Sequence, residues 1–235
     1  SNLTKEIKEN IKKISKNLNK EGLRVVAVCQ KNDIRDISHF DISNEKNMVL
    51  MGFIGFLDPP KESAKESIEQ LNKSGIRVIV LTGDNAEVTK SVCSRVNINS
   101  KKIVLGSELD KLSDFAVQRL LKKTNIFAKL SPIQKSRIIR LLKESGNVVG
   151  YMGDGINDSP SLTNSDVGIS VDTAVDIAKE SADIILLEKD LNVLLSGVNE
   201  GRKTFVNLMK YIKLATSFNF GEVLSVIVAS IALPF

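Results

Sequence analysis

Histidine, cysteine and aromatic residues are scarce in this chain of 235 residues. It has one histidine, two cysteines and no tryptophan, and aromatic residues account for 5% of it. Cys29 and Cys93 are too few, and too far along the chain from His39, to predict a metal site built from thiolates and an imidazole. His39 lies in a polar stretch, so no catalytic role is assigned to it. Two free thiols are typical of a reducing compartment, and we expect the residues that carry them to be cytosolic.

Repeats and low-complexity tracts do not stand out either, and we expect no secretory signal at the start. The basic opening segment, residues 3–20, alternates lysine with isoleucine and leucine at helical spacing, which predicts a helix with a solvated lysine face. It lacks the interleaved aromatic and arginine side chains of nucleic-acid-binding segments. With a formal net charge of +5, we expect no nucleic-acid partner.

A hydrophobic content of 42% is sufficient for a core, and the length allows one or two domains. Apolar runs alternate with segments of helical spacing. Predicted strands are 23–30, 49–56, 77–81, 103–104, 125–128, 147–152, 167–171 and 183–187. Predicted helices are 3–20, 61–74, 87–96, 109–122, 132–145, 173–180 and 191 onward, with a polar linker over 31–47. Strands separated by helices of about ten to fifteen residues predict an α/β fold with a mostly parallel sheet.

A glycine-flanked acidic loop, Gly153 to Asp158, directly follows the apolar run from Val148 to Met152. Glycine allows a tight turn and close approach to a ligand. Carboxylate and amide oxygens suit a magnesium ion that also contacts phosphate oxygens. The loop therefore predicts a magnesium and phosphate site, and a surface turn held by Asn and Asp side chains is the alternative.

Two further segments place polar residues where a predicted strand ends. Thr82 follows the apolar run 78–81, and Lys135 follows a predicted strand over 125–128. Ser131 and Gln134 predict a capping box with proline at the first helical position, which puts Lys135 near a helix start, where a phosphate is favoured. A solvent-exposed lysine is the alternative. A hydroxyl, a lysine and paired acids at strand ends are what phosphoryl transfer requires.

Four segments in this order resemble the phosphorylation domain of the P-type cation-transporting ATPases, a branch of the haloacid-dehalogenase-like phosphotransferases. They are residues 56–61 (FLDPPK), 81–85 (LTGDN), 131–135 (SPIQK) and 152–160 (MGDGINDSP). The first of them, together with residues 177–190, is most similar to the bacterial magnesium-transporting branch. The resemblance covers nearly the whole chain. It implies a haloacid-dehalogenase-like, Rossmann-type parallel sheet with flanking helices, followed by a long helix that enters the membrane.

The resemblance also implies roles for the phosphate-site residues. Thr82 is similar to the hydroxyl that holds the transferred phosphoryl group, and Lys135 to the lysine that neutralises its oxygens. Asp154 resembles the magnesium ligand. Asn157 and Asp158 resemble the residues that complete the phosphate and metal network, so Asp158 is a second candidate for the metal. Mg²⁺ and ATP are the implied cofactors.

Nucleotide contacts are implied at Gly83 and Asp84, which resemble residues lining the ATP phosphates, and at Lys129, where relatives have a basic residue. Residues 22–28 are similar to the final strand of the family's nucleotide-binding domain, and Arg24 would then face the phosphates. Solvated side chains are the alternative for Lys129 and Arg24.

The phosphorylated aspartate of the family, in its Asp-Lys-Thr-Gly-Thr motif, is absent from the sequence. Asp58 precedes two prolines and is predicted to cap the helix that begins at Lys61, while Asp33, Asp36 and Asp41 lie in polar surroundings. The resemblance therefore implies a C-terminal-side fragment.

The expected division is the end of a nucleotide-binding domain over 1–47, a phosphorylation domain over 48–200, and a stalk with an incomplete transmembrane helix over 201–235. Four basic residues precede the uncharged apolar run 223–235: Arg202, Lys203, Lys210 and Lys213. Flanking positive charge marks a cytoplasmic side, so residues 1–210 are expected there. The run has thirteen residues whereas a span takes about 20, so a buried core helix is the alternative.

Asn219 and Glu222 share one face of this helix because they lie three residues apart. An acid at membrane depth is a functional candidate by default, and both residues are assigned to a candidate transported-ion site. Calcium pumps carry Asn and Glu here, whereas many magnesium-transporting relatives have an amide in place of Glu222. The transported ion is therefore left open.

The leading hypothesis is a part of an ATP-driven cation pump of the cell membrane that works through an aspartyl phosphate, with magnesium as the first candidate ion. Its partners would be ATP, a divalent cation, the lipid bilayer and the remaining parts of the same pump. A calcium or other cation pump, a soluble haloacid-dehalogenase-like phosphatase, and a non-catalytic remnant or binding module are the alternatives.

Overall fold

The computed structural model describes residues 4–31, 41–42 and 45–233 of the chain. It forms two compact units, residues 1–189 and 190–235, and each is described by itself. His39, Asp33, Asp36 and most of the predicted linker lie outside the described residues.

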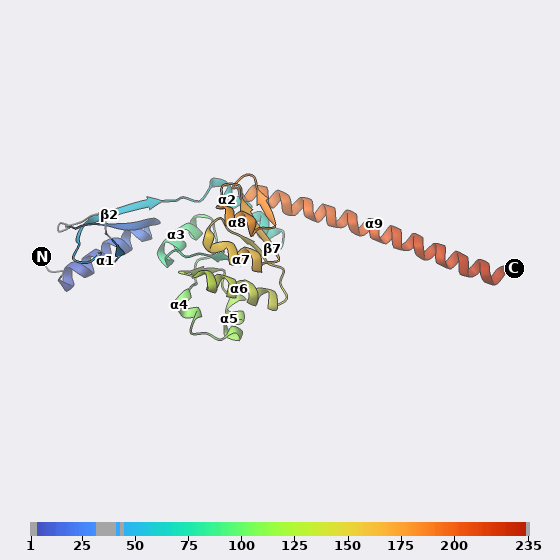
Figure 1. Cartoon of the computed structure of the whole chain (residues 1–235), viewed down its shortest axis with the longest axis horizontal. Coiled ribbons are helices and arrows are strands. Elements are labelled where there is room, and N and C mark those ends of the chain that lie inside the picture. The colour runs from blue at the N-terminus through green and yellow to red at the C-terminus, as the bar shows by residue number, and fades with distance from the viewer. Residues whose placement is uncertain (1–3, 32–40, 43–44, 234–235) are drawn as a thin grey trace. The chain divides into compact units, whose positions relative to one another are not determined.

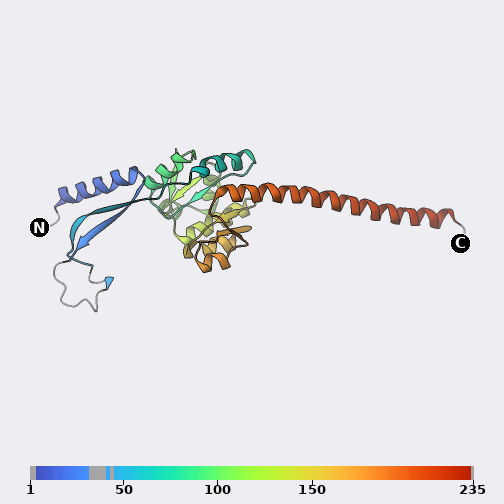
Figure 2. The same cartoon turned by 90° about the horizontal axis from the view of Figure 1, so that it is seen from above.

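The first unit begins with a helix and an antiparallel strand pair (Figures 1 and 2). Helix α1 (Lys5–Lys20) is capped by Thr4, whose hydroxyl accepts a hydrogen bond from the amide of Ile7 at 3.3 Å. Strand β1 (Leu23–Gln30) pairs along its whole length with β2 (Val49–Leu57). The boundary expected between residues 47 and 48 thus falls in the connection between two paired strands, and the three-part domain division stays a prediction.

Two parallel three-stranded sheets follow. In the first, β5 (Ile126–Ala128) lies between β3 (Val80–Leu81) and β4 (Ile103–Leu105). In the second, β7 (Val167–Val171) lies between β6 (Gly150–Met152) and β8 (Ile184–Leu186). The prediction of an α/β fold with parallel strands and flanking helices is confirmed, although the described strands form two sheets and not one.

The helices of the first unit that follow β2 alternate with these strands along the chain. They are α2 (Glu62–Lys73), α3 (Ala86–Arg95), α4 (Gly106–Leu109), α5 (Asp114–Leu121), α6 (Pro132–Glu144), the 3₁₀ turn η2 (Ile156–Asp158), α7 (Ser159–Asn164) and α8 (Asp176–Glu180). The capping box predicted for α6 is confirmed, because the Ser131 hydroxyl accepts from the Gln134 amide and the Gln134 side chain accepts from the Ser131 amide.

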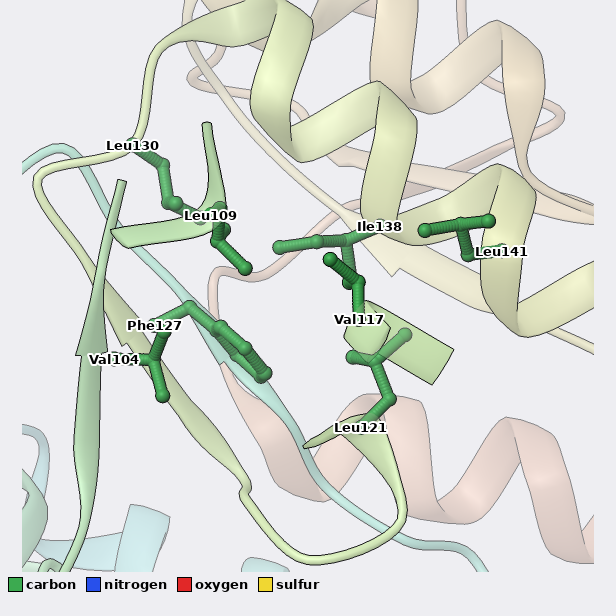
Figure 3. Packing of buried hydrophobic residues seen from close by; sticks show 8 residues of the cluster. All are labelled: Val104, Leu109, Val117, Leu121, Phe127, Leu130, Ile138 and Leu141. Carbon is green, nitrogen blue, oxygen red and sulfur yellow. The ribbon is translucent and has the colours of Figure 1, made fainter. Parts of the chain in front are cut away.

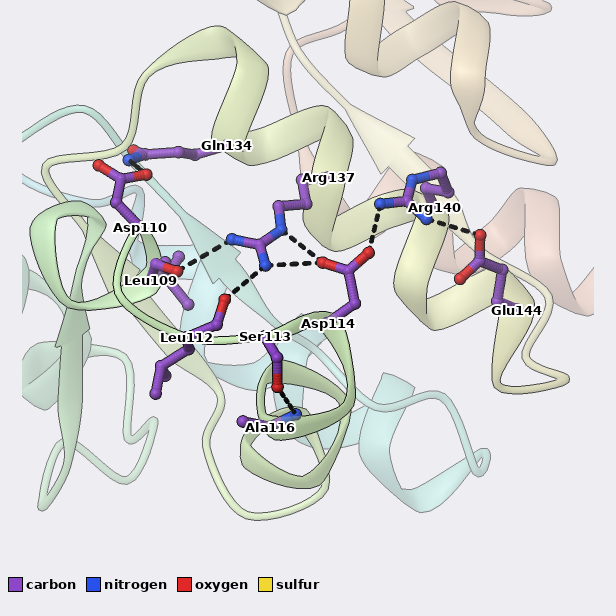
Figure 4. A network of polar contacts seen from close by, with 10 residues as sticks. All are labelled: Leu109, Asp110, Leu112, Ser113, Asp114, Ala116, Gln134, Arg137, Arg140 and Glu144. Atoms are coloured by element: carbon purple, nitrogen blue, oxygen red, sulfur yellow. Dashed lines mark hydrogen bonds and ion pairs between the residues drawn. The ribbon is translucent and has the colours of Figure 1, made fainter.

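A single helix over 109–122 was expected, and that prediction is wrong because the chain breaks between α4 and α5. Arg137 donates to the carbonyls of Leu109 at 2.9 Å and Leu112 at 2.8 Å, and these bonds hold the connecting turn open (Figure 4). The Ser113 hydroxyl then caps α5 by accepting from the Ala116 amide. A guanidinium from a helix distant in sequence thus decides where two shorter helices end and begin.

The role expected for Asp58 as a helix cap is also wrong. The N-cap of α2 is Lys61, and no side-chain cap bond is formed there. The Lys61 carbonyl instead accepts from the amide of Ala64 at 3.0 Å. The first turn of α2 is therefore stabilised by its own backbone bonds.

Four strands are shorter than predicted, and the largest differences are in β3 and β6, which both lack a neighbour on one side. Among the described strands, β3 pairs only with β5, and β6 only with β7. Regular pairing begins at Val80 and at Gly150, after residues that were predicted to be in the strands. Val148 is 86% exposed. Val148 was predicted to lie in a buried strand, but it faces solvent. Such exposure is expected at the uncovered edge of a sheet.

The core lies between the first sheet and helices α4, α5 and α6 (Figure 3). Phe127 of β5 is fully buried, and so are Val117 of α5 and Ile138 of α6. The cluster comprises Val104, Leu109, Val117, Leu121, Phe127, Leu130, Ile138 and Leu141. Because β5 and α6 both contribute to it, the core fixes the turn between them, residues 129–131, and the first turn of α6, which carries Lys135, at the carboxyl end of the strand.

The second unit is the helix α9 (Leu191–Ala232), which is continuous over 42 residues (Figure 1). Its N-cap is Asp190, whose carboxylate accepts from the Asn192 amide at 2.8 Å. By its length and composition, the helix is long and apolar enough to cross a membrane. None of its residues is buried, which does not favour the alternative of a buried core helix.

Candidate active site

A largely buried ion pair joins the start of α6 to the acidic loop after β6. The Lys135 ammonium lies 2.7 Å from the Asp158 carboxylate, and the two side chains are 12% and 14% exposed. The capping box and Pro132 fix the first turn of α6, and η2 presents Asp158. Two residues that the sequence analysis assigned to one phosphate site are thus in direct contact.

Tyr151 completes the surroundings of Asp158 and was not singled out from the sequence. Its hydroxyl donates to the same Asp158 oxygen at 2.6 Å, while the other oxygen accepts from the Gly155 amide at 3.3 Å. Burial acts to raise the pKa of Asp158, but the hydrogen bonds from Lys135 and Tyr151 outweigh it, and the pKa lies below its ordinary value. The one sequence feature that could have pointed to Tyr151 is its position, a phenol within the apolar run that precedes the loop.

Gly153 is required by the position of Asp158. A β-carbon added at residue 153 would lie 2.6 Å from the β-carbon of Asp158, much closer than van der Waals contact. Any side chain there would push Asp158 away from Lys135. The glycine of this loop therefore serves the packing of the carboxylate that follows it.

Thr82 and Asp84 form a second polar turn at the end of β3. The Thr82 hydroxyl accepts from the Asp84 amide at 3.1 Å and donates to the Asp84 carboxylate at 3.3 Å. The Thr82 carbonyl accepts from the Leu130 amide, and the Asp84 carbonyl from the Lys129 amide. These backbone bonds join the turns after β3 and β5, so Thr82 lies at the same edge of the sheet as the start of α6.

The residues assigned to the nucleotide surround this turn. Arg24 of β1 forms an ion pair with Asp84 at 2.9 Å, and the two side chains are 72% and 38% exposed. Lys129 is exposed and has a φ of 53°, a left-handed conformation that costs a non-glycine residue energy and is often found at functional sites. A β-carbon at Gly83 would meet only the Leu130 carbonyl, at an ordinary 3.6 Å.

Asp154 and Asn157 lie on the outer side of the acidic loop, where both are exposed. One oxygen of Asp154 accepts from the Lys189 ammonium at 2.5 Å. Lys189 was not singled out from the sequence either. No group of three or more His, Cys, Asp or Glu residues that could hold a metal occurs in the part of the chain that the structure describes.

The carboxylates of the acidic loop fit Mg²⁺ if the metal also takes ligands from a substrate phosphate. Mg²⁺ keeps several waters and commonly binds through one or two carboxylates together with substrate phosphates. Asp154 offers an exposed carboxylate that already holds a cation, the Lys189 ammonium. Asp158 fits a metal less well, because both of its oxygens accept hydrogen bonds from protein donors.

Comparison with known proteins identifies the family to which this geometry belongs. The family model of the haloacid dehalogenase-like hydrolases matches residues 3–166. The chain belongs to this family. The matched range includes the parallel strands β3 to β6 and the polar turns at their carboxyl ends.

Curated relatives of this haloacid dehalogenase-like chain are P-type ATPases. The magnesium-transporting ATPase, P-type 1, of Escherichia coli is 51% identical over 225 residues, which cover 96% of the chain and 25% of the relative. Calcium-transporting ATPase 1 of Bacillus cereus is 34% identical over 231 residues, which cover 97% of the chain and 26% of the relative. The chain thus spans about a quarter of the length of these relatives. The resemblance to P-type cation-transporting ATPases is confirmed.

A solved structure agrees on the fold. A zinc-transporting PIB-type ATPase in its E2.Pi state matches with a TM-score of 0.64 and 21% identity, over 94% of this haloacid dehalogenase-like chain and 30% of the other. At this identity the match supports the arrangement of strands and helices only.

The hydrogen bond from Tyr151 to Asp158 leads to a first prediction. Tyr151→Phe keeps the packing but removes a donor to a buried carboxylate, so the free energy of unfolding should fall by about 1.5 to 3 kcal/mol. Urea denaturation of the two proteins measures the difference. The matched control is Tyr211→Phe. Tyr211 is 69% exposed, so the loss of its hydroxyl should leave the free energy of unfolding unchanged. Equal stabilities for Tyr151→Phe and wild type would contradict the structural role of the phenol.

Proposed function

We propose that this chain is the phosphate-handling part of an ATP-driven cation pump that works through an aspartyl phosphate, with magnesium as the transported ion. The observation that carries the proposal is the 51% identity to a magnesium-transporting ATPase over 225 residues. The calcium-transporting relative is 34% identical over a similar length, which favours magnesium over calcium.

Thr82 and Lys135 would hold the oxygens of the transferred phosphoryl group. Catalysis of phosphoryl transfer consists mainly of positioning and charge neutralisation. Support comes from the backbone bonds that put Thr82 and the start of α6 at one sheet edge, and from the Lys135 ammonium, which Asp158 holds at 2.7 Å. An ammonium that is already oriented needs little rearrangement when phosphate charge arrives.

The metal would be held by Asp154, with Asn157 and Asp158 completing the network around it. When bound, Mg²⁺ would neutralise charge on the phosphate oxygens. Asp154 has the exposure that a metal shared with substrate requires. Asp158 would act chiefly by orienting Lys135, since protein donors already occupy both of its oxygens.

ATP would lie against the turn after β3, near Gly83 and Asp84. Arg24 and Lys129 are exposed cations that both contact Asp84. The Arg24 side chain forms an ion pair with its carboxylate, and the Lys129 amide donates to its carbonyl. Their positive charge would attract the phosphates of the nucleotide. The Arg24 pair with Asp84 is largely solvated, so it would give way to a ligand at little cost.

The phosphorylated aspartate would come from another part of the same pump. Family members carry it on a strand that precedes the threonine turn, and no such motif lies upstream of Thr82 in this sequence. Among the described strands, β3 and β6 each pair on one side only. Their unpaired backbone groups are where a further parallel strand would bind.

The helix α9 would link this part to a multi-pass domain in the cell membrane, with residues 1–210 on the cytoplasmic side. Its composition and length support a membrane span. Asn219 and Glu222, which are both exposed on α9, would contribute to the path of the transported cation.

A chimaera tests the proposal. The 225 matched residues of this chain replace their counterparts in the Escherichia coli magnesium-transporting ATPase, and the chimaera is expressed in cells that lack their own magnesium transporters. We expect growth at low magnesium, and Mg²⁺ uptake in preference to Ca²⁺ by vesicles that contain the purified chimaera. Uptake of Ca²⁺ in preference to Mg²⁺ would favour a calcium pump, and a folded chimaera that transports neither ion would contradict the proposal.

A further inference from the structure

Lys189 is the last residue before the N-cap of α9, and its side chain reaches back 35 residues to the acidic loop. Its ammonium lies 2.5 Å from an oxygen of Asp154. Both residues belong to the unit formed by residues 1–189. The contact therefore lies within one compact part of the molecule.

Each carboxylate of the site is paired with one cation, but the pairs differ in burial. Asp158 holds Lys135, with side chains 14% and 12% exposed, whereas Asp154 holds Lys189, with side chains 49% and 59% exposed. Among the described ion pairs, Lys189 is the only partner of Asp154. A buried pair is costly to separate, while a solvated one contributes little and exchanges readily. Of the two lysines paired with the acidic loop, Lys189 is thus the one that can leave.

We propose that Lys189 is a tethered competitor of Mg²⁺ for Asp154. The ammonium pairs with one oxygen of the carboxylate when the metal is absent, and it must move away when Mg²⁺ binds, because two cations held at one carboxylate repel each other. The inference deepens the proposed function, since it depends on the metal role of Asp154. According to this inference, Lys189 sets the concentration of Mg²⁺ at which the metal occupies the site.

The size of the effect follows from the weakness of a solvated pair. An exposed ion pair of typical strength leaves the carboxylate unpaired for a substantial fraction of the time, so competition should weaken apparent Mg²⁺ affinity by about two- to six-fold. The competition is electrostatic and should fade as salt screens the pair, since the Debye length falls from about 10 Å at 0.1 M to about 3 Å at 1 M salt. Packing alone would not produce this salt dependence.

The test is a titration of the 235-residue chain with MgCl₂, followed by calorimetry and by the shift in melting temperature. Lys189→Met, which keeps the length of the stem but removes the charge, should bind Mg²⁺ about two- to six-fold more tightly than wild type at low salt. The difference should shrink in KCl of about 1 M. The matched control is Lys179→Met, whose lysine pairs with Asp176 and whose loss should leave the affinity unchanged.

Affinity in Lys189→Met that equals or falls below that of wild type, including the case in which neither binds, overturns the competition. Asp154→Ala separates this result from failure of the proposed function. If Asp154→Ala removes Mg²⁺ binding while Lys189→Met changes nothing, the metal role stands and only the competition is wrong. If Asp154→Ala binds Mg²⁺ as wild type does, the assignment of the metal to Asp154 and the competition both fall.

Discussion

Lys135→Met is expected to lower the free energy of unfolding of the chain by about 3 kcal/mol. Removing one partner of a buried ion pair leaves an uncompensated charge and typically costs about 3 to 5 kcal/mol. We expect the lower end of that range because both side chains retain some exposure, 12% and 14%, and because Tyr151 and Gly155 still donate to Asp158. Urea denaturation in metal-free buffer measures the change.

The pH dependence of that loss identifies its cause. In wild type, Asp158 has a lowered pKa, so its contribution to stability is present above the ordinary carboxyl pKa of 3.8 and is lost as the pH falls through the lower folded value. In Lys135→Met the main opposing charge is gone, burial raises the pKa of Asp158, and the carboxyl takes up a proton at higher pH. The gap in stability between the two proteins should therefore narrow as the pH falls.

Two further variants control this experiment. Lys143→Met removes a lysine whose ion pair with Asp166 is more exposed, at 36% and 34%, and should leave stability close to wild type. Lys135→Met combined with Asp158→Asn removes both charges and should recover part of the loss, because no ion is then left unpaired. A Lys135→Met protein as stable as wild type at neutral pH would show that the pair is not formed in solution.

Asp154→Ala in the chimaera is expected to abolish formation of the phosphoenzyme. A magnesium ion on phosphate oxygens is worth several kcal/mol of transition-state stabilisation, and about 4 kcal/mol corresponds to a thousandfold in rate. The label from radioactive ATP that resists acid and is released by hydroxylamine should therefore fall at least about a thousandfold in initial rate. Rapid quenching with acid measures it.

Asp176→Ala is the matched control, since the side chain of Asp176 is 92% exposed and its loss should leave labelling unchanged. The 235-residue chain by itself should take no label, because the proposed function places the receiving aspartate outside it. Labelling of Asp154→Ala at a rate near wild type would refute the metal role of this residue. Hydroxylamine-sensitive label on the isolated chain would refute the statement that the nucleophile lies elsewhere.

The sequence by itself determined the elements whose signals are local. A capping box is a relation between residues three apart, so Ser131 and Gln134 were sufficient to place the start of α6. Strands rich in branched apolar residues and bounded by polar turns, such as β7, were likewise found within their own segments. The order of Thr82, Lys135 and Asp154 at strand ends was sufficient to suggest phosphoryl transfer, because parallel strands bring their carboxyl ends to one edge.

Only the tertiary structure decided features that depend on side chains distant in sequence. Arg137 splits the helix predicted over 109–122, and regular pairing in β3 and β6 begins later than predicted. The phenol of Tyr151 and the ammonium of Lys189 become part of the site only when folding brings them to Asp158 and Asp154. A tyrosine in an apolar run and a lysine before a helix have no local pattern that predicts their partners. Long-range contacts therefore determine which side chains pair with the carboxylates of the acidic loop, and the periodicity of the sequence does not encode such contacts.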